Sequence, residues 1–91
     1  MSQADITVEG TPNPNAAKFV VSGAALGSKS RSYFGADEVG DDELAARLFE
    51  VGGVRALLIV DNFITVTKAD EVAWEDIVED ITWIIGEARG S

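Results

Sequence analysis

The stretch of residues 54–68 constrains the fold more than any other part of the chain. It consists of two runs rich in Val, Ile, Phe and Thr on either side of Asp61-Asn62. These residue types suit a pleated, half-buried surface, and Asp and Asn tolerate the left-handed backbone that a two-residue hairpin loop needs. The sequence therefore predicts a β-hairpin in which Val60 faces Phe63.

The two faces of this hairpin differ, because side chains alternate across a sheet. The stronger apolar face, which we expect to lie under helices, carries Leu57, Ile59, Ile64 and Val66, with Arg55 and Lys68 at its far end. The second face is mixed and carries Ala56, Leu58, Val60, Phe63, Thr65 and Thr67. Two interpretations stay open for it: residues 22–40 cover it, which we favour in part, or it is an apolar patch of the kind that marks an interface.

Two further strands are predicted ahead of the hairpin. Residues 5–9 alternate polar and apolar side chains, and residues 17–21 form the next strand, with Phe19 and Val21 on one face. Between them, residues 10–15 contain two prolines, two asparagines and a glycine, which indicates a rigid, non-helical loop. Residues 22–40 are the least regular part of the chain, with a short strand as a candidate at residues 32–34.

A first helix is predicted at about residues 42–51, where apolar residues recur at helical spacing. Asp41 is a suitable N-cap because its carboxylate can accept hydrogen bonds from the first turn. Gly52-Gly53 is expected to end the helix, since glycine is common just beyond helix C-termini.

A second helix is predicted at about residues 72–88, with Asp70 as its cap. Its apolar stripe consists of Trp74, Ile77, Val78, Ile81, Ile84, Ile85 and Ala88. Trp83 falls outside this stripe, roughly 180° from its centre. Trp83 either folds onto a flanking loop or is an exposed anchor for a partner or a second copy, because Trp is enriched at binding hot spots.

Together these elements predict one α+β domain over residues 1–91, with residues 1–4 and 89–91 loose. We expect two layers: a mostly antiparallel sheet of about four strands, with a short fifth as a candidate, and two helices on one face. The order of elements is ββαββα. A chain of 91 residues has room for one modest core.

Composition excludes several classes of function. The chain has neither cysteine nor histidine, which removes disulfides, thiolate metal sites and the commonest general base. Sixteen acidic residues against seven basic ones give a net charge of −9, so we expect no nucleic-acid or anionic-membrane partner. No apolar run approaches the ~18 residues of a membrane span and no signal pattern opens the chain, so we expect a cytoplasmic protein. The acidic runs lack EF-hand spacing and are interpreted as helix caps and a solvated face.

Two stretches of sequence carry a family resemblance. The first is Thr11-Pro12-Asn13-Pro14-Asn15-Ala16-Ala17-Lys18-Phe19. The second is Leu48-Phe49-Glu50-Val51-Gly52-Gly53-Val54, followed by Asp61-Asn62-Phe63-Ile64-Thr65-Val66-Thr67-Lys68 and Trp74. In combination they resemble the N-terminal domain of the Nfu (NifU-like) iron–sulfur cluster scaffold proteins, over about residues 5–88. The pair Gly52-Gly53 departs from the family, which more often has an acidic residue before a single glycine.

The resemblance implies an α+β domain with a place in iron–sulfur cluster assembly or delivery. In the family, a Cys-x-x-Cys motif in a separate C-terminal domain holds the cluster, and this chain has no cysteine. We therefore expect a stand-alone, non-enzymatic accessory or adaptor domain without a cofactor of its own. Its partners would be proteins, such as iron–sulfur assembly factors or client proteins. The alternative is a homo-oligomeric structural or regulatory module unrelated to cluster transfer, and a homodimer is left open.

The candidate partner surface consists of Asn13, Asn15, Lys18, Phe63 and Trp83. For the loop that holds the two asparagines, a structural interpretation is favoured over recognition, because Asn side chains commonly satisfy the backbone groups of a turn. No catalytic, cofactor-binding or metal-ligating residue is predicted.

Overall fold

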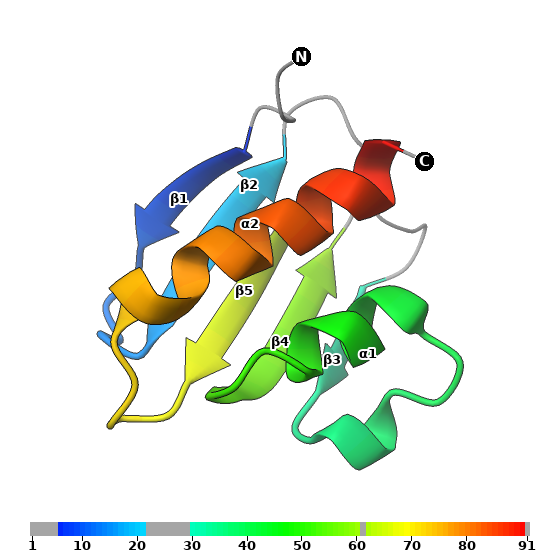
Figure 1. The fold of residues 1–91 in the computed structure, drawn as a ribbon, viewed down its shortest axis with the longest axis horizontal. Coiled ribbons are helices and arrows are strands. Elements are labelled where there is room, and N and C mark those ends of the chain that lie inside the picture. Colours follow the sequence, from blue (N-terminus) through cyan, green and yellow to red (C-terminus); the bar gives the residue numbers. More distant parts are fainter. Residues whose placement is uncertain (1–5, 22–29, 61, 91) are drawn as a thin grey trace.

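Five strands form one sheet, and two α-helices lie across one of its faces (Figure 1). The computed structural model describes residues 6–21, 30–60 and 62–90. In chain order the elements within these ranges are β1 (Ile6–Gly10), β2 (Ala16–Val21), β3 (Arg31–Tyr33), the 3₁₀ helix η1 (Ala36–Glu38), α1 (Glu43–Phe49), β4 (Val54–Val60), β5 (Phe63–Lys68) and α2 (Trp74–Gly90).

The strands follow the order β1-β2-β5-β4-β3, and each neighbouring pair is antiparallel. The predicted hairpin is confirmed as β4–β5, with Val60 paired to Phe63. Asp61, the first residue of its predicted loop, lies outside the described residues. The short strand expected at residues 32–34 is β3, which lies one residue earlier and adds a fifth strand beside β4. The predicted α+β class is therefore confirmed.

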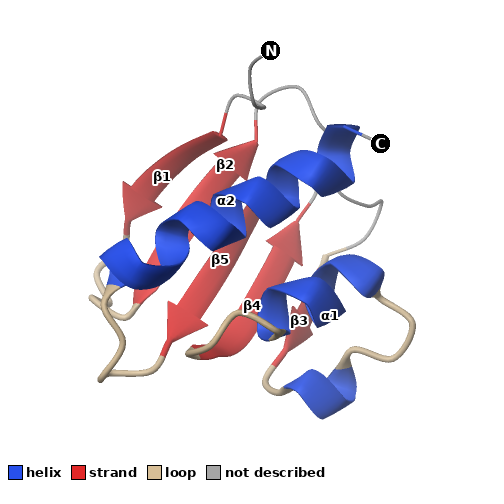
Figure 2. Ribbon diagram, in the orientation of Figure 1, coloured by secondary structure: helices blue, strands red, loops and turns tan. Residues whose placement is uncertain are grey.

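The core lies between the sheet and the two helices, which both cover the same face (Figure 2). The four apolar residues of the predicted hairpin face are buried, but Arg55, predicted at its far end, is exposed because the register of β4 shifts between Val54 and Ala56. The predicted stripe of α2 packs into the same core over its members from Trp74 to Ile85. The largest fully buried side chains are Phe19, Val21, Leu48, Ile59, Ile64, Val66, Ile81 and Ile85. In Figure 1, α2 crosses β2 and β5 while α1 lies over the β4–β3 side of the sheet. The two helices therefore run side by side on one surface.

The N-cap of α1 is Asp42 and not Asp41, so this prediction was wrong. One carboxylate oxygen of Asp42 accepts a hydrogen bond from the Ala45 N–H at 3.2 Å. The other accepts from Arg31 Nε at 2.7 Å and from the Tyr33 hydroxyl at 2.9 Å. Because Arg31 and Tyr33 belong to β3, tertiary contacts decide which aspartate caps the helix. The helix ends at Phe49, two residues before the predicted end at Val51.

These contacts shift two pKa values. Partial burial opposes the charged form of Asp42, but the hydrogen bonds from Arg31, Ala45 and Tyr33 and the charge of Arg31 outweigh it. The pKa of Asp42 is therefore lower than its ordinary value of 3.8. The hydrogen bond to Asp42 raises the pKa of Tyr33, with desolvation and the nearby carboxylate charge adding to the shift.

The lowered pKa of Asp42 predicts a pH-dependent stability. The contribution is fully present above the ordinary pKa of 3.8 and is lost as the pH falls through the lower pKa of the folded state. We expect Asp42→Asn to lower the free energy of unfolding by about 1–2 kcal/mol at pH 7, since the charged partner of Arg31 is removed. Urea unfolding at pH 7, 5 and 3 should show the difference from wild type shrinking at the lowest pH. Asp41→Asn is the exposed control, and a constant difference for Asp42→Asn would contradict the prediction.

The start of α2 also differs from the prediction. The helix begins at Trp74 and not near residue 72, and Asp70 is not its cap. A turn holds the preceding segment, with the Ala69 N–H donating to Gly53 O at 2.8 Å and the Val72 N–H donating to Ala69 O at 3.2 Å. The carboxylate of Asp70 accepts a hydrogen bond from Asn15 instead. At its other end α2 continues to Gly90, so residues 89–90, expected to be loose, are helical.

Candidate protein-interaction surfaces

The loop before β2 is stabilised by its own side chains. Thr11 Oγ1 lies 2.9 and 3.0 Å from the carbonyl oxygens of Asn13 and Ala16, which share its single proton, and it accepts from the Asn13 N–H at 3.1 Å. The side-chain oxygen of Asn13 accepts from the Asn15 N–H at 2.9 Å. These contacts form a local turn in which short polar side chains replace backbone partners. They support the structural interpretation of Asn13.

Asn15 connects this loop to the far end of β5. Its side-chain oxygen accepts from Lys68 Nζ at 3.0 Å, and its amide donates to Asp70. Lys68 is only 8% exposed, and its ammonium also donates to Ala69 O at 3.2 Å. Trp74 contributes its ring, 5.7 Å from the same ammonium. The Asn15–Lys68–Asp70–Trp74 cluster therefore brings together side chains that are far apart in the sequence.

The same cluster fixes the loop onto α2. Trp74 Nε1 donates to Pro14 O at 3.1 Å, and its ring lies 6.3 Å from that of Phe19. Both sequence stretches that carry the family resemblance thus meet at one end of the sheet. Their main visible role there is to join the loop, β5 and α2.

We expect Asn15→Ala to lower the free energy of unfolding by about 1.5–3 kcal/mol, because a largely buried ammonium loses a hydrogen-bond partner. Asn13→Ala is the matched control, since Asn13 is exposed and its side chain accepts one bond from a neutral N–H. We expect it to cost about 0.5–1 kcal/mol. Thermal and urea unfolding measure both values. Equal costs would show that the Asn15–Lys68 contact contributes little.

Lys18 and Phe63 lie on the second face of the sheet, away from the helices. Lys18 Nζ is 4.3 Å from the centre of the Phe63 ring. Leu58 on the same face is 39% exposed. The described part of residues 22–40 does not lie over this face, because β3 pairs with the edge of β4 and η1 follows it (Figure 1). Residues 22–29 lie outside the described residues, so the predicted partial cover by residues 22–40 stays untested.

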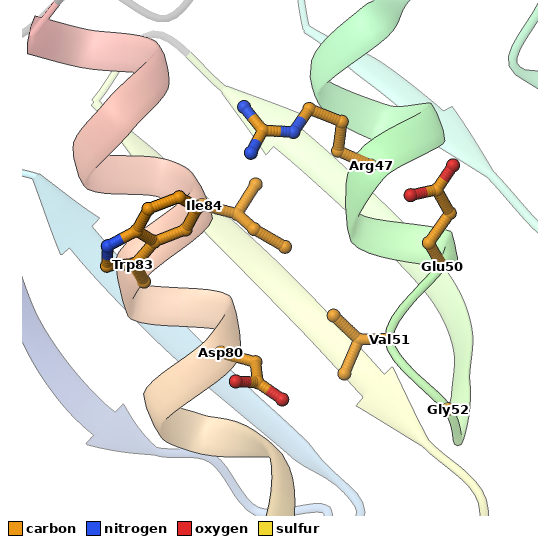
Figure 3. Close-up of a pocket in the computed structure, with 7 residues that line it drawn as sticks. All are labelled: Arg47, Glu50, Val51, Gly52, Asp80, Trp83 and Ile84. Carbon is orange, nitrogen blue, oxygen red and sulfur yellow. The ribbon is translucent and has the colours of Figure 1, made fainter.

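A groove of about 350 Å³ separates α1 from α2, and Trp83 forms part of its wall (Figure 3). The lining residues are Arg47, Glu50, Val51, Gly52, Asp80, Trp83 and Ile84. Trp83 is 53% exposed, as its place outside the apolar stripe predicts. Its ring lies at the edge of the groove, 5.8 Å from the guanidinium carbon of Arg47. Trp83 therefore belongs to the exposed face of α2, as predicted, and also borders the groove next to α1.

Arg47 and Glu87 connect the two helices at one end of this groove. Arg47 donates to Glu87 Oε1 at 2.8 Å. Val51 and Ile84 supply the apolar floor, while Glu50 and Asp80 stand on the α1 and α2 sides (Figure 3).

The five candidate residues therefore occupy three places. Asn13 and Asn15 belong to the loop, Lys18 and Phe63 to the second sheet face, and Trp83 to the groove. The sequence did not indicate the groove, because it depends on how α1 and α2 pack side by side. It also did not single out Phe34, which follows β3 and is 76% exposed.

Two properties of the described residues limit what the surface can hold. Among residues 6–21, 30–60 and 62–90, no three His, Cys, Asp or Glu side chains are grouped so that they could hold a metal ion. No helix in the same ranges is long and apolar enough to cross a membrane.

Comparison with known protein families gives a match that spans most of the chain. Residues 6–90 match the family described as "Scaffold protein Nfu/NifU N terminal". The chain is 33% identical over 76 residues to "Conserved virulence factor C" of Staphylococcus aureus strain MRSA252, covering 84% of this chain and 20% of that protein. It is 32% identical over 77 residues to the human "NFU1 iron-sulfur cluster scaffold homolog, mitochondrial", covering 84% of this chain and 30% of that protein.

Solved structures give a similar result. The solution NMR structure of a NifU-like protein from Saccharomyces cerevisiae superposes with a TM-score of 0.82 and 34% identity. The match covers 93% of this chain and 77% of that one. The chain spans only a fifth to a third of the length of the two curated relatives, so their other segments have no counterpart in these 91 residues.

Proposed function

The chain belongs to the Nfu/NifU N-terminal scaffold family, and on this premise we propose that it is a non-enzymatic adaptor in iron–sulfur cluster assembly or delivery. It acts through contacts with other proteins, and the cluster is the cargo of those proteins. Its partners are assembly factors or the proteins that receive clusters.

The observation that carries this proposal is the donor set of the chain. Proteins hold iron–sulfur clusters with cysteine thiolates, and histidine is the usual substitute. The sequence contains neither residue. The residues present therefore do not fit a cluster, although the family is described as one of scaffold proteins. A domain of this family that lacks cluster ligands can still take part in cluster assembly or delivery by binding other proteins through its surface.

The first experiment asks which proteins the chain binds. The tagged chain is used as bait in a lysate at low salt, and bound proteins are identified by mass spectrometry. A bait of similar size and net charge but unrelated fold is the control. We expect enrichment of iron–sulfur assembly factors or iron–sulfur proteins over this control. Equal recovery with both baits would argue against the adaptor function.

The second experiment asks whether the chain holds a cluster. The purified chain is incubated with iron and sulfide without oxygen, desalted, and examined by visible absorbance and iron analysis. We expect no stoichiometric cluster. One cluster per chain, or one per pair of chains, would contradict this part of the proposal.

The homo-oligomeric alternative rests on Trp83 and on the sheet face that carries Phe63, which would then be the surfaces of self-association. Light scattering over a range of protein concentrations distinguishes it. A stable dimer that Trp83→Ala abolishes would favour the alternative, whereas a monomer throughout favours the adaptor.

A further inference from the structure

We infer that the groove between α1 and α2 binds a short basic segment of a partner protein, with a Lys or Arg beside an apolar residue. This inference deepens the proposed adaptor function, on which it rests. It assigns to one groove the contact that the function requires, and it names the chemistry of the partner.

The shape of the groove supplies the first argument. Its floor is apolar, with Ile84 only 9% exposed and Val51 packed against the core. Trp83 stands at its edge with 53% of its surface exposed. A large aromatic side chain beside an apolar floor is the arrangement in which a partner side chain can be desolvated on binding. An apolar residue of the partner can therefore lie against Val51 and Ile84, next to the Trp83 ring.

The charge around the groove supplies the second argument. Glu50 and Asp80 stand on its opposite walls (Figure 3). Both residues are exposed, and within the described part of the chain neither carboxylate has a hydrogen bond or an ion pair. The basic residue that lines the groove, Arg47, is bound to Glu87. The open charge of the groove is therefore negative.

The other charged residues of the two helices add to the negative charge of the groove. We count the charged side chains that are described on α1, on Glu50 just after it, and on α2. There is one base, Arg47, and there are seven acids: Glu43, Glu50, Glu75, Asp76, Glu79, Asp80 and Glu87. The strands carry the opposite balance, with four bases and one acid: Lys18, Arg31, Arg55, Lys68 and Glu9. Among these described side chains the acidic excess thus lies on the helix layer and not on the strands, which favours a basic partner there and repels an acidic one.

Trp83 adds a reason for Lys or Arg in the partner segment. A cation over the face of an indole ring is attracted by the ring's electron distribution. Arg47 already approaches this ring at 5.8 Å from within the chain. A second cation can approach from the groove, where Asp80 and Glu50 neutralise its charge.

The probe is a library of random peptides displayed on phage and selected against the full 91-residue chain at low salt. Selected peptides are synthesised, and their affinities are measured by fluorescence anisotropy. We expect them to contain Lys or Arg next to an apolar residue, and to bind more weakly as salt rises. Selection of acidic or uncharged sequences, or of none at all, would overturn the inference.

Matched variants locate the contact. Glu50→Gln with Asp80→Asn removes two charges from the groove, and we expect at least about tenfold weaker binding. Asp76→Asn with Glu79→Gln removes two charges from exposed positions of α2 outside the lining, and binding should stay within about twofold. Trp83→Ala should weaken binding at least as much as the groove pair does. Equal losses for the groove pair and its control would overturn the inference.

Gly52→Glu provides a variant with the opposite expected effect. Gly52 lines the groove, and a Cβ at this position would meet nothing within 4 Å. We expect this third carboxylate to tighten binding a few-fold at low salt. Weaker binding would contradict the proposed charge of the partner.

The same variants separate this inference from the proposed function. If the Glu50→Gln, Asp80→Asn chain still recovers iron–sulfur assembly proteins as well as wild type does, the groove inference fails and the adaptor function stands. If wild type recovers none, the adaptor function fails whatever the peptides show. A dimer that Trp83→Ala abolishes would assign the groove to a second copy and overturn the inference.

Discussion

Ile81→Ala is expected to lower the free energy of unfolding by about 2–5 kcal/mol, because a large side chain is removed from a closely packed interior. Ile81 is fully buried on the face of α2 that packs against the sheet. Ile77 and Ile85, one helical turn before and after Ile81, are buried as well. We expect the surrounding side chains to fill this space only in part. Urea unfolding, with the midpoint and slope both recorded, measures the effect.

Trp83→Ala is the matched control for this prediction. Trp83 lies two residues away on the same helix and is larger than Ile81, yet it is 53% exposed. We expect its removal to cost less than about 0.5 kcal/mol, in the range of surface substitutions. The contact of its ring with Arg47 is exposed and adds little. Similar costs for both variants would mean that the helix is rotated from the position described.

Gly53→Ala is expected to cost about 2–4 kcal/mol, from backbone strain and overpacking together. Gly53 has a φ of +100°, a conformation that L side chains rarely adopt. A Cβ at this position would lie 2.7 Å from a methyl carbon of Val72. The same residue accepts the Ala69 N–H through its carbonyl, so the backbone has little freedom to move away.

Gly52→Ala is the matched control, because neither the strain nor the overpacking expected at Gly53 should occur at Gly52. Gly52 does not have a positive φ, and a Cβ there would meet nothing within 4 Å. We expect this variant to be as stable as wild type or more stable by up to about 1 kcal/mol, because alanine restricts the unfolded chain. Differential scanning calorimetry on both variants measures the contrast. A loss at Gly52 as large as that at Gly53 would show that the turn needs both glycines.

These two glycines also explain a departure noticed in the sequence. The family more often has an acidic residue before a single glycine, where this chain has Gly52-Gly53. The structure requires glycine only at the second position. An acidic side chain at the first would therefore fit the backbone, and it would stand at the α1–α2 groove.

Local patterns were sufficient for the strands of the hairpin and for the buried face of α2. The two-residue loop fixes the pairing of Val60 with Phe63, and alternation then assigns every side chain of β4 and β5 from Leu57 to Val66 to a face. The helical spacing of Ile77, Ile81 and Ile85 likewise leaves one orientation for α2. In both elements the nearest neighbours in sequence decide the result.

Helix ends required information that lies elsewhere in the chain. Asp41 and Asp42 are equally suitable caps by residue type, and the choice of Asp42 depends on Arg31 and Tyr33 of β3. Asp70 is suited to a cap by residue type, but its carboxylate accepts a hydrogen bond from Asn15. A local sequence pattern cannot identify hydrogen-bond partners that lie this far away in the sequence.

The candidate surfaces were predictable only in part for the same reason. The exposure of Trp83 followed from its place on the helix, but its position beside Arg47 and Glu50 depends on the packing of two helices. The alternation of β5 placed Lys68 on the inner face, but Asn15, which accepts a hydrogen bond from its ammonium, belongs to a loop outside the hairpin.

The pairing of β2 with β5 has a consequence for how the domain folds. The β1–β2 and β4–β5 hairpins each form between neighbouring stretches of sequence, whereas β2–β5 joins residues as distant as Ala16 and Thr67. An isolated two-stranded hairpin is marginally stable at best. The surface under α2 is complete only when the two hairpins join. We therefore expect the domain to unfold in a single cooperative transition, with no separate transition for either hairpin.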